Sequence, residues 1–179
     1  MSKSLSGCRW DLVRKVIKYM EGLNFEKTPK QILENLEKTG RYVFHGSPFK
    51  ILKFQPRQAF NSIKKEDGEY EKIPDGDPAV FTSPFVKTAI FMAVMNKKNA
   101  PLESRTGFSS NNNGNFEFRA TQETMNQISE DASGYVYVFE KEKFQEINFN
   151  ESVSHEEVEP IMFIEVTKKD LPEITIKDF

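Results

Sequence analysis

Residues 41–60, with the sequence RYVFHGSPFKILKFQPRQAF, decide how the rest of the chain is arranged. The segment begins as a short apolar strand, Tyr42 to Phe44, and then meets His45, Gly46, Ser47 and Pro48. Glycine permits backbone angles that other residues avoid, and proline removes a donor and favours a turn. These residues therefore predict a sharp turn, at which the ring of His45 points into a cleft and a ligand approaches the backbone closely.

An ordinary loop is the alternative interpretation, because Gly-Ser-Pro is common between elements of any protein. The scarcity of histidine favours a site, since the chain has only His45 and His155. Both lie in segments to which the motifs below also point.

Composition limits the classes to which the protein can belong. A chain of 179 residues is long enough for one domain with its own core, so we expect a single domain over 1–179, helical over 1–40 and β-rich over 41–179. Cys8 is the sole cysteine, which excludes an internal disulfide, and no zinc-binding pattern occurs. The 25 basic and 27 acidic residues give no strong field for nucleic acid or anionic membrane. With neither a secretion signal nor a membrane span in the sequence, we expect a soluble, cytoplasmic protein.

The first half of the chain predicts three helices and two strands. Apolar residues at helical spacing predict helices over about 10–20 and 29–38, the second with Thr28 as N-cap and Gly40 as its stop. Residues 61–77 are polar and predict a surface loop, a candidate lid over a site. A strand is expected over 79–82 and a helix over 86–95, and residues 96–115 are expected to be turn-rich.

Strand character dominates the second half. The β-propensity runs at 116–118, 134–139, 147–149 and 161–166 predict strands, and 171–176 predicts an edge strand. A short helix is expected over 121–128. The acidic run from Ser152 to Glu159 reads as a loop that leads into the 161–166 strand.

Three segments carry the chemistry, namely 42–47, then 80–83 with its helix, and then 152–159. In this order they resemble the ADP-ribosyltransferase superfamily, in particular its poly(ADP-ribose) polymerase and diphtheria-toxin-like branch. There, three strands supply a His, a Tyr and a Glu around the nicotinamide end of NAD. The resemblance extends from Arg41 to Leu171. It implies an α+β fold of split mixed and antiparallel sheets around an NAD-binding cleft, with N-terminal helices packed alongside.

The resemblance also implies roles for individual residues. Glu159 and His45 would be catalytic, with Glu156 or Glu157 as alternative carboxylates. Phe81 stands where the family has Tyr, so stacking is retained and the hydroxyl is lost. Arg57 and Gln58 lie where a side chain that contacts phosphate would be useful, because the planar fork of an arginine binds phosphate at two points, although an ordinary surface arginine is equally compatible. The implied NAD-binding residues are His45, Gly46, Ser47, Arg57, Phe81, Thr82, Ser83, Thr88 and Phe91.

The resemblance implies transfer of ADP-ribose from NAD to a macromolecular or nucleotide acceptor, with release of nicotinamide. A carboxylate beside the ribose stabilises the developing oxocarbenium charge, and no metal is required. An inert member of the fold that binds a nucleotide or a protein remains an alternative. RNA 2'-phosphotransferase chemistry is a further alternative, disfavoured by the balanced charge and the lack of an arginine-rich first motif.

Overall fold

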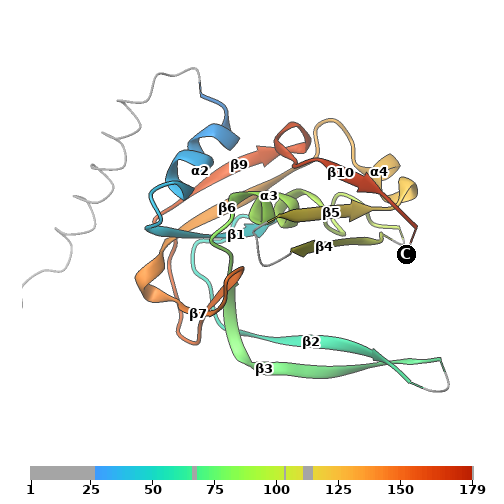
Figure 1. The fold of residues 1–179 in the computed structure, drawn as a ribbon, viewed down its shortest axis with the longest axis horizontal. Helices are drawn as coiled ribbons and strands as arrows, with labels where there is room; N and C mark the ends of the chain where they lie inside the picture. Colours follow the sequence, from blue (N-terminus) through green and yellow to red (C-terminus); the bar gives the residue numbers. More distant parts are fainter. Residues whose placement is uncertain (1–26, 66–67, 103, 111–114, 179) are drawn as a thin grey trace, which may run out of the picture.

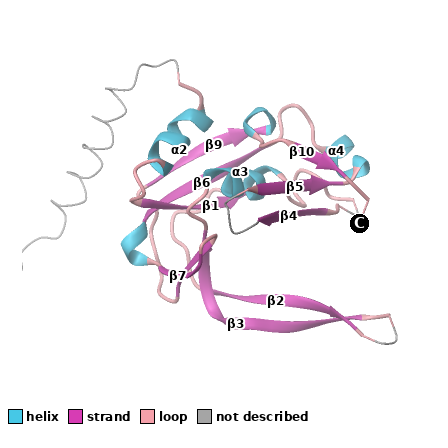
Figure 2. Cartoon of the chain, in the orientation of Figure 1, coloured by secondary structure: helices cyan, strands magenta, loops and turns pink. Residues whose placement is uncertain are grey.

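The computed structural model describes residues 27–65, 68–102, 104–110 and 115–178. Within them the chain has an α+β fold of three mostly antiparallel sheets, one of them mixed, and few helices (Figures 1 and 2). The helix expected over 10–20 lies outside the described residues.

The central sheet consists of β1 (Tyr42–Ser47), β6 (Ser133–Glu140) and β9 (Met162–Thr167), in the order β1-β6-β9 and antiparallel throughout. The expected strand of 42–44 continues through His45 and Gly46, which pair with Tyr137 and Val136 of β6. The expected turn at His45 is therefore wrong. The ladder with β6 holds these residues extended, which local turn signals do not reveal.

Gly46 instead allows the close approach of helix α3 (Val86–Val94) to the central sheet. This helix packs on β1 and β6 so closely that a Cβ at Gly46 would lie 1.9 Å from the carbonyl oxygen of Ala89. A Cβ at Gly134 of β6 would lie 2.0 Å from the carbonyl oxygen of Ala93. Glycine on the strands and alanine on the helix thus let the two backbones touch. The helix is confirmed as expected, and its apolar side chains form the main core with the central sheet.

The second sheet has the order β2-β3-β8-β7 and is antiparallel. Its strands are β2 (Arg57–Lys64), β3 (Tyr70–Thr82), β7 (Gln145–Asn148) and β8 (Glu151–Ser154). The expected loop and lid over 61–77 are wrong, because β2 and β3 form a long two-stranded ribbon that runs away from the other elements (Figure 1). Backbone pairing forms this ribbon without a buried face, so its sequence lacks apolar alternation. Strand β8 also replaces the first part of the expected acidic loop.

The third sheet joins β10 (Ile174–Ile176), β5 (Phe116–Ala120) and β4 (Thr106–Ser110) in that order. Strand β10 runs parallel to β5, and β4 runs antiparallel to it. The strand at 116–118 and the edge strand near the end of the chain are confirmed. Residues 96–115 were expected to be turn-rich, and β4 corrects this expectation over five of them.

Helix α2 (Pro29–Glu37) is confirmed, with Thr28 and Gln31 forming a reciprocal capping box. Its last residue ties it to α3, because the Glu37 carboxylate accepts a hydrogen bond from the Val86 backbone N–H at 2.7 Å. A carboxylate at a helix N-terminus is favourable to the helix dipole. Partial burial nevertheless raises the pKa of Glu37 above its ordinary value.

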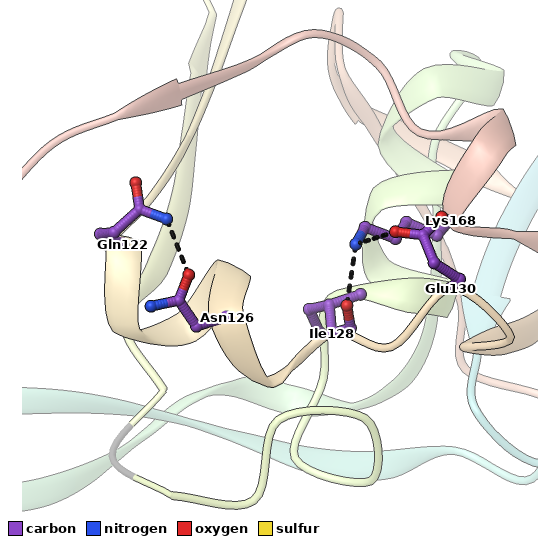
Figure 3. Close-up of polar contacts among 5 residues, drawn as sticks. All are labelled: Gln122, Asn126, Ile128, Glu130 and Lys168. Atoms are coloured by element: carbon purple, nitrogen blue, oxygen red, sulfur yellow. Dashed lines mark hydrogen bonds and ion pairs between the residues drawn. The ribbon is translucent and has the colours of Figure 1, made fainter.

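The remaining helical segments are α4 (Gln122–Gln127), which is confirmed, and two 3₁₀ turns, η1 (Lys141–Lys143) and η2 (Lys168–Asp170). Figure 3 shows Lys168, whose ammonium donates to the Ile128 carbonyl at 2.9 Å and to Glu130 at 2.7 Å. This contact fixes the segment after α4 against the end of β9. Of the helices in the described ranges, none combines the length and the apolar character needed to cross a membrane.

Candidate functional site

Two pockets adjoin at His45 and Phe81, which line both of them. The first, which we call the α3 pocket, has a volume of about 300 Å³ and lies where β1, the end of β3, α3 and β8 meet. Six of the nine residues expected to bind NAD line it. Its lining comprises Phe44, His45, Gly46, Phe81, Thr82, Ser83, Thr88, Ala89, Met92, Phe108, Asn148, Asn150 and Glu151.

A backbone rung between Phe44 and Ser83 forms the base of the α3 pocket. Each residue donates its N–H to the carbonyl of the other at 2.8 Å. Backbone groups along a strand alternate in direction, so the N–H and C=O of Gly46 face the same edge of β1 as those of Phe44. The rung is an isolated antiparallel bridge, so no ladder continues from it toward Gly46, and β1 is an edge strand of its sheet. This edge therefore presents a donor and an acceptor of Gly46 at the α3 pocket.

His45 lies between the two pockets with its ring held on two sides. Its Nδ1 is 2.7 Å from the Phe81 carbonyl oxygen, and its ring meets Phe54 edge-on at 4.9 Å. Burial lowers the pKa of His45, and the charge of Arg57 lowers it further, against the opposing effect of the Phe81 carbonyl. Because a carbonyl only accepts, Nδ1 carries the proton, and Nε2 of the neutral ring is left as an acceptor.

Two buried oxygens of the α3 pocket lack a hydrogen-bond partner within the described residues, namely Thr88 Oγ1 and Asn150 Oδ1. Thr88 is only 6% exposed, in the first turn of α3. The Asn150 amide nitrogen donates to Ser110 Oγ at 3.2 Å, which fixes the side chain on one side. Buried polar atoms are normally satisfied, so a water molecule or a ligand is needed to pair with these two oxygens.

The acidic residue among those that line the α3 pocket is Glu151, at the start of β8, which the sequence analysis missed. Pairing of Thr82 with Ser152 brings this glutamate beside the end of β3. Glu159 is exposed and lines neither pocket, which corrects its expected position next to His45. Its charge acts on Lys53 instead.

The alternative carboxylates also lie elsewhere. Glu157 forms an ion pair with Lys53 and accepts from Gln55 at 3.3 Å. Glu156 is exposed, and its N–H donates to Ser154 Oγ. Neither residue is among those that line the α3 pocket.

The second pocket, which we call the loop pocket, has a volume of about 280 Å³ and holds the expected residues Ser47 and Arg57. It lies between the base of the β2–β3 ribbon and the segment that follows β1. Its lining comprises His45, Ser47, Phe49, Ile51, Lys53, Phe54, Gln55, Arg57, Gln58, Ala59, Ala79, Val80 and Phe81.

Phe91 is the one expected NAD-binding residue that lines neither pocket. It is 1% exposed, and its ring lies 5.0 Å from that of Phe118 and 6.2 Å from that of Phe108. Its ring therefore lies in the core between α3 and β5.

Comparison of the chain with protein-family models, with curated proteins and with solved structures finds no match. Across the described ranges, no group of three or more His, Cys, Asp or Glu side chains is placed to hold a metal ion.

Proposed function

We propose that the protein is an NAD-dependent ADP-ribosyltransferase, with nicotinamide in the α3 pocket and the ADP part of NAD in the loop pocket. The observation that carries the proposal is the convergence of four features in one pocket of suitable size. These are the carboxylate of Glu151, the ring of His45, the open backbone edge at Gly46 and the unpartnered hydroxyl of Thr88.

Nicotinamide matches the α3 pocket in shape and in hydrogen bonding. Its flat ring suits the space beside Phe81, since aromatic faces favour offset or edge contacts. Its carboxamide has one acceptor and two donor hydrogens, which complement the N–H and C=O of Gly46 and the oxygen of Thr88. Each of these contacts fixes the orientation of the ring, so the glycosidic bond points toward Glu151.

The chemistry that follows needs a negative charge next to the ribose. The bond from ribose C1' to the nicotinamide nitrogen breaks, and its electron pair neutralises the pyridinium ring, which leaves as nicotinamide. The oxocarbenium-like ribose is stabilised by the Glu151 carboxylate, a group placed where positive charge develops. The acceptor forms a new bond to C1' and loses its proton to Glu151 or to solvent. His45 Nε2, as an acceptor, orients a ribose hydroxyl.

The loop pocket suits the anionic half of NAD. Arg57 stands at its wall, and a guanidinium binds phosphate through two parallel hydrogen bonds. Lys53 adds a second cation, partly offset by its ion pair with Glu157. Because His45 and Phe81 line both pockets, one dinucleotide can extend across them.

Transfer of label from NAD to proteins or nucleic acids of a cell extract tests the proposal. Glu151→Gln keeps the size of the side chain and removes its charge, so we expect labelling and nicotinamide release to fall by about 100-fold or more. Glu159→Gln is the matched control, a glutamate outside both pockets, and should stay within about twofold of the unaltered protein.

Three results decide between the proposal and its alternative. Turnover that depends on Glu151 supports the transferase. NAD binding without turnover in the unaltered protein supports an inert nucleotide-binding member of the fold. The presence of Phe81, where the resembled family has Tyr, is also compatible with that alternative. If NAD does not bind, both interpretations fail.

A further inference from the structure

We propose that Tyr137 positions the outer wall of the loop pocket and thereby sets the affinity for the ADP half of NAD. The choice of ADP as ligand rests on the function proposed above, whereas the role of Tyr137 in holding the pocket wall does not. Tyr137 itself lines neither pocket, so it would act through the segment that it holds.

Tyr137 lies on β6 opposite His45 and is fully buried. Its ring packs against Phe54 at 4.8 Å and Phe163 at 5.8 Å. Its hydroxyl accepts the N–H of Ile51 at 2.5 Å and donates to the carbonyl of Phe49 at 2.8 Å. One oxygen thus binds two backbone groups that are two residues apart in the segment between β1 and β2. Burial raises the pKa of Tyr137, so the hydroxyl keeps the proton that it donates.

The segment over residues 48–53 forms few other hydrogen bonds through its middle. It begins after Ser47 and ends at Phe54, whose backbone exchanges hydrogen bonds with Val158 at 2.8 and 3.0 Å. The side chains of Phe49 and Leu52 are 61% and 79% exposed, so their burial does not fix the segment.

The other contacts of this segment lie at its start or on side chains, among them the Lys50 ammonium 4.6 Å from the centre of the Phe163 ring and the Lys53–Glu157 ion pair. Ser47 Oγ accepts the Phe49 N–H at 3.2 Å, and Lys98 donates to the Pro48 carbonyl at 3.1 Å on the surface. Ile51 is partly buried against the cluster around Tyr137. The paired hydrogen bonds of Tyr137 are therefore the main polar anchor of the middle of the segment.

This anchor matters for binding because the segment supplies one wall of the loop pocket. Phe49, Ile51 and Lys53 all line it, whereas none of the three lines the α3 pocket. Tyr137→Phe keeps the ring in the core and removes only the hydroxyl. We expect two neutral hydrogen bonds to be lost, the wall to become mobile, and ADP to bind about tenfold more weakly. Nicotinamide should bind as before.

The full chain with Tyr137→Phe is compared with Tyr135→Phe, a matched control on the same strand. Tyr135 packs edge-on against Phe163 at 5.8 Å, and no described residue is hydrogen-bonded to its hydroxyl. Calorimetric titrations with ADP and with nicotinamide measure each pocket separately, and amide hydrogen exchange at Ile51 measures the anchor without any ligand. The expected result is weaker ADP binding and faster exchange in Tyr137→Phe alone.

The outcomes separate the two proposals. Unchanged exchange at Ile51, or equal loss of ADP and nicotinamide, overturns the role of Tyr137. If Tyr137→Phe exchanges faster at Ile51 but the unaltered protein binds neither ADP nor nicotinamide, Tyr137 still holds the segment. That result overturns the proposed function and the link between Tyr137 and ADP binding.

Discussion

The α3 pocket and the loop pocket share two residues and differ in what holds their walls. The α3 pocket is built from buried elements, because α3 presses directly on the backbone of β1 and β6 through Gly46 and Gly134. The loop pocket is built from exposed segments, the base of the ribbon and residues 48–53. One site can thus combine a wall that core packing fixes with a wall that a few hydrogen bonds fix.

The largest expected effect is on the packed wall. Gly46→Ala places a methyl group 1.9 Å from the Ala89 oxygen and 2.7 Å from the Ala93 nitrogen, both of them backbone atoms. Since α3 must shift, we expect a loss of about 3 kcal/mol in the free energy of unfolding, as for severe overpacking. Urea unfolding measures it, and Gly134→Ala should behave alike. A loss below about 1 kcal/mol would mean that the contact is loose.

Protonation of His45, the residue between the two pockets, should lower the free energy of unfolding. Its pKa is lower in the folded state, so the unfolded chain binds more protons as pH falls below about 6.5. Stability should be complete above that pH and decline below it, by at most about 1.4 kcal/mol per pH unit. Unfolding measured between about pH 7.5 and about pH 5.5 should show this decline vanish in His45→Gln. The exposed His155 gives the control, His155→Gln, which should leave the decline intact.

Thr88 tests whether a polar group in the α3 pocket lowers the stability of the free protein and strengthens the binding of nicotinamide. Thr88→Val removes a buried hydroxyl that lacks a partner, so the free protein should gain about 1 kcal/mol while nicotinamide binds about tenfold more weakly. The control is Thr124→Val, where the residue is also buried but its hydroxyl accepts the Arg105 N–H at 2.9 Å. That variant should lose stability, and thermal unfolding distinguishes the two. Destabilisation by Thr88→Val would show that its hydroxyl is satisfied in solution.

The smallest effect is expected in the loop wall. Leu52→Ala should change the free energy of unfolding by less than about 0.5 kcal/mol, because its side chain is already in water. Leu33→Ala, the same substitution at a fully buried position of α2, should cost about 2–5 kcal/mol. Similar losses for both in urea unfolding would show that Leu52 is buried in solution and that the loop wall is packed after all.

The sequence predicted the buried part of this fold better than the exposed part. Apolar runs located β1, β6 and β9, because burial on the core sets the pattern of their side chains. The β2–β3 ribbon was mistaken for a loop, since neither of its faces is buried and backbone pairing has no sequence signature of its own. Its charged and turn-forming residues resemble those of any surface segment.

The candidate site was predicted in the same uneven way. Local motifs found His45, Gly46 and Thr88, which lie in or beside regular elements. Glu151 was missed because its place depends on the pairing of Thr82 with Ser152, 70 residues apart in the chain. Phe91 was misplaced because a family pattern gives its position along the helix and not the direction of its side chain.

Strand β3 is one continuous strand in two very different settings. At Ile73 it pairs with β2 alone, with its side chain 41% exposed, whereas at Phe81 it pairs with β8 and flanks the core. Two-stranded hairpins are marginally stable in water, so the outer ribbon should open and reclose many times for each global unfolding event. A protease that cleaves the outer part of β3 would thus meet an accessible chain while the end of the same strand beside the α3 pocket stays closed.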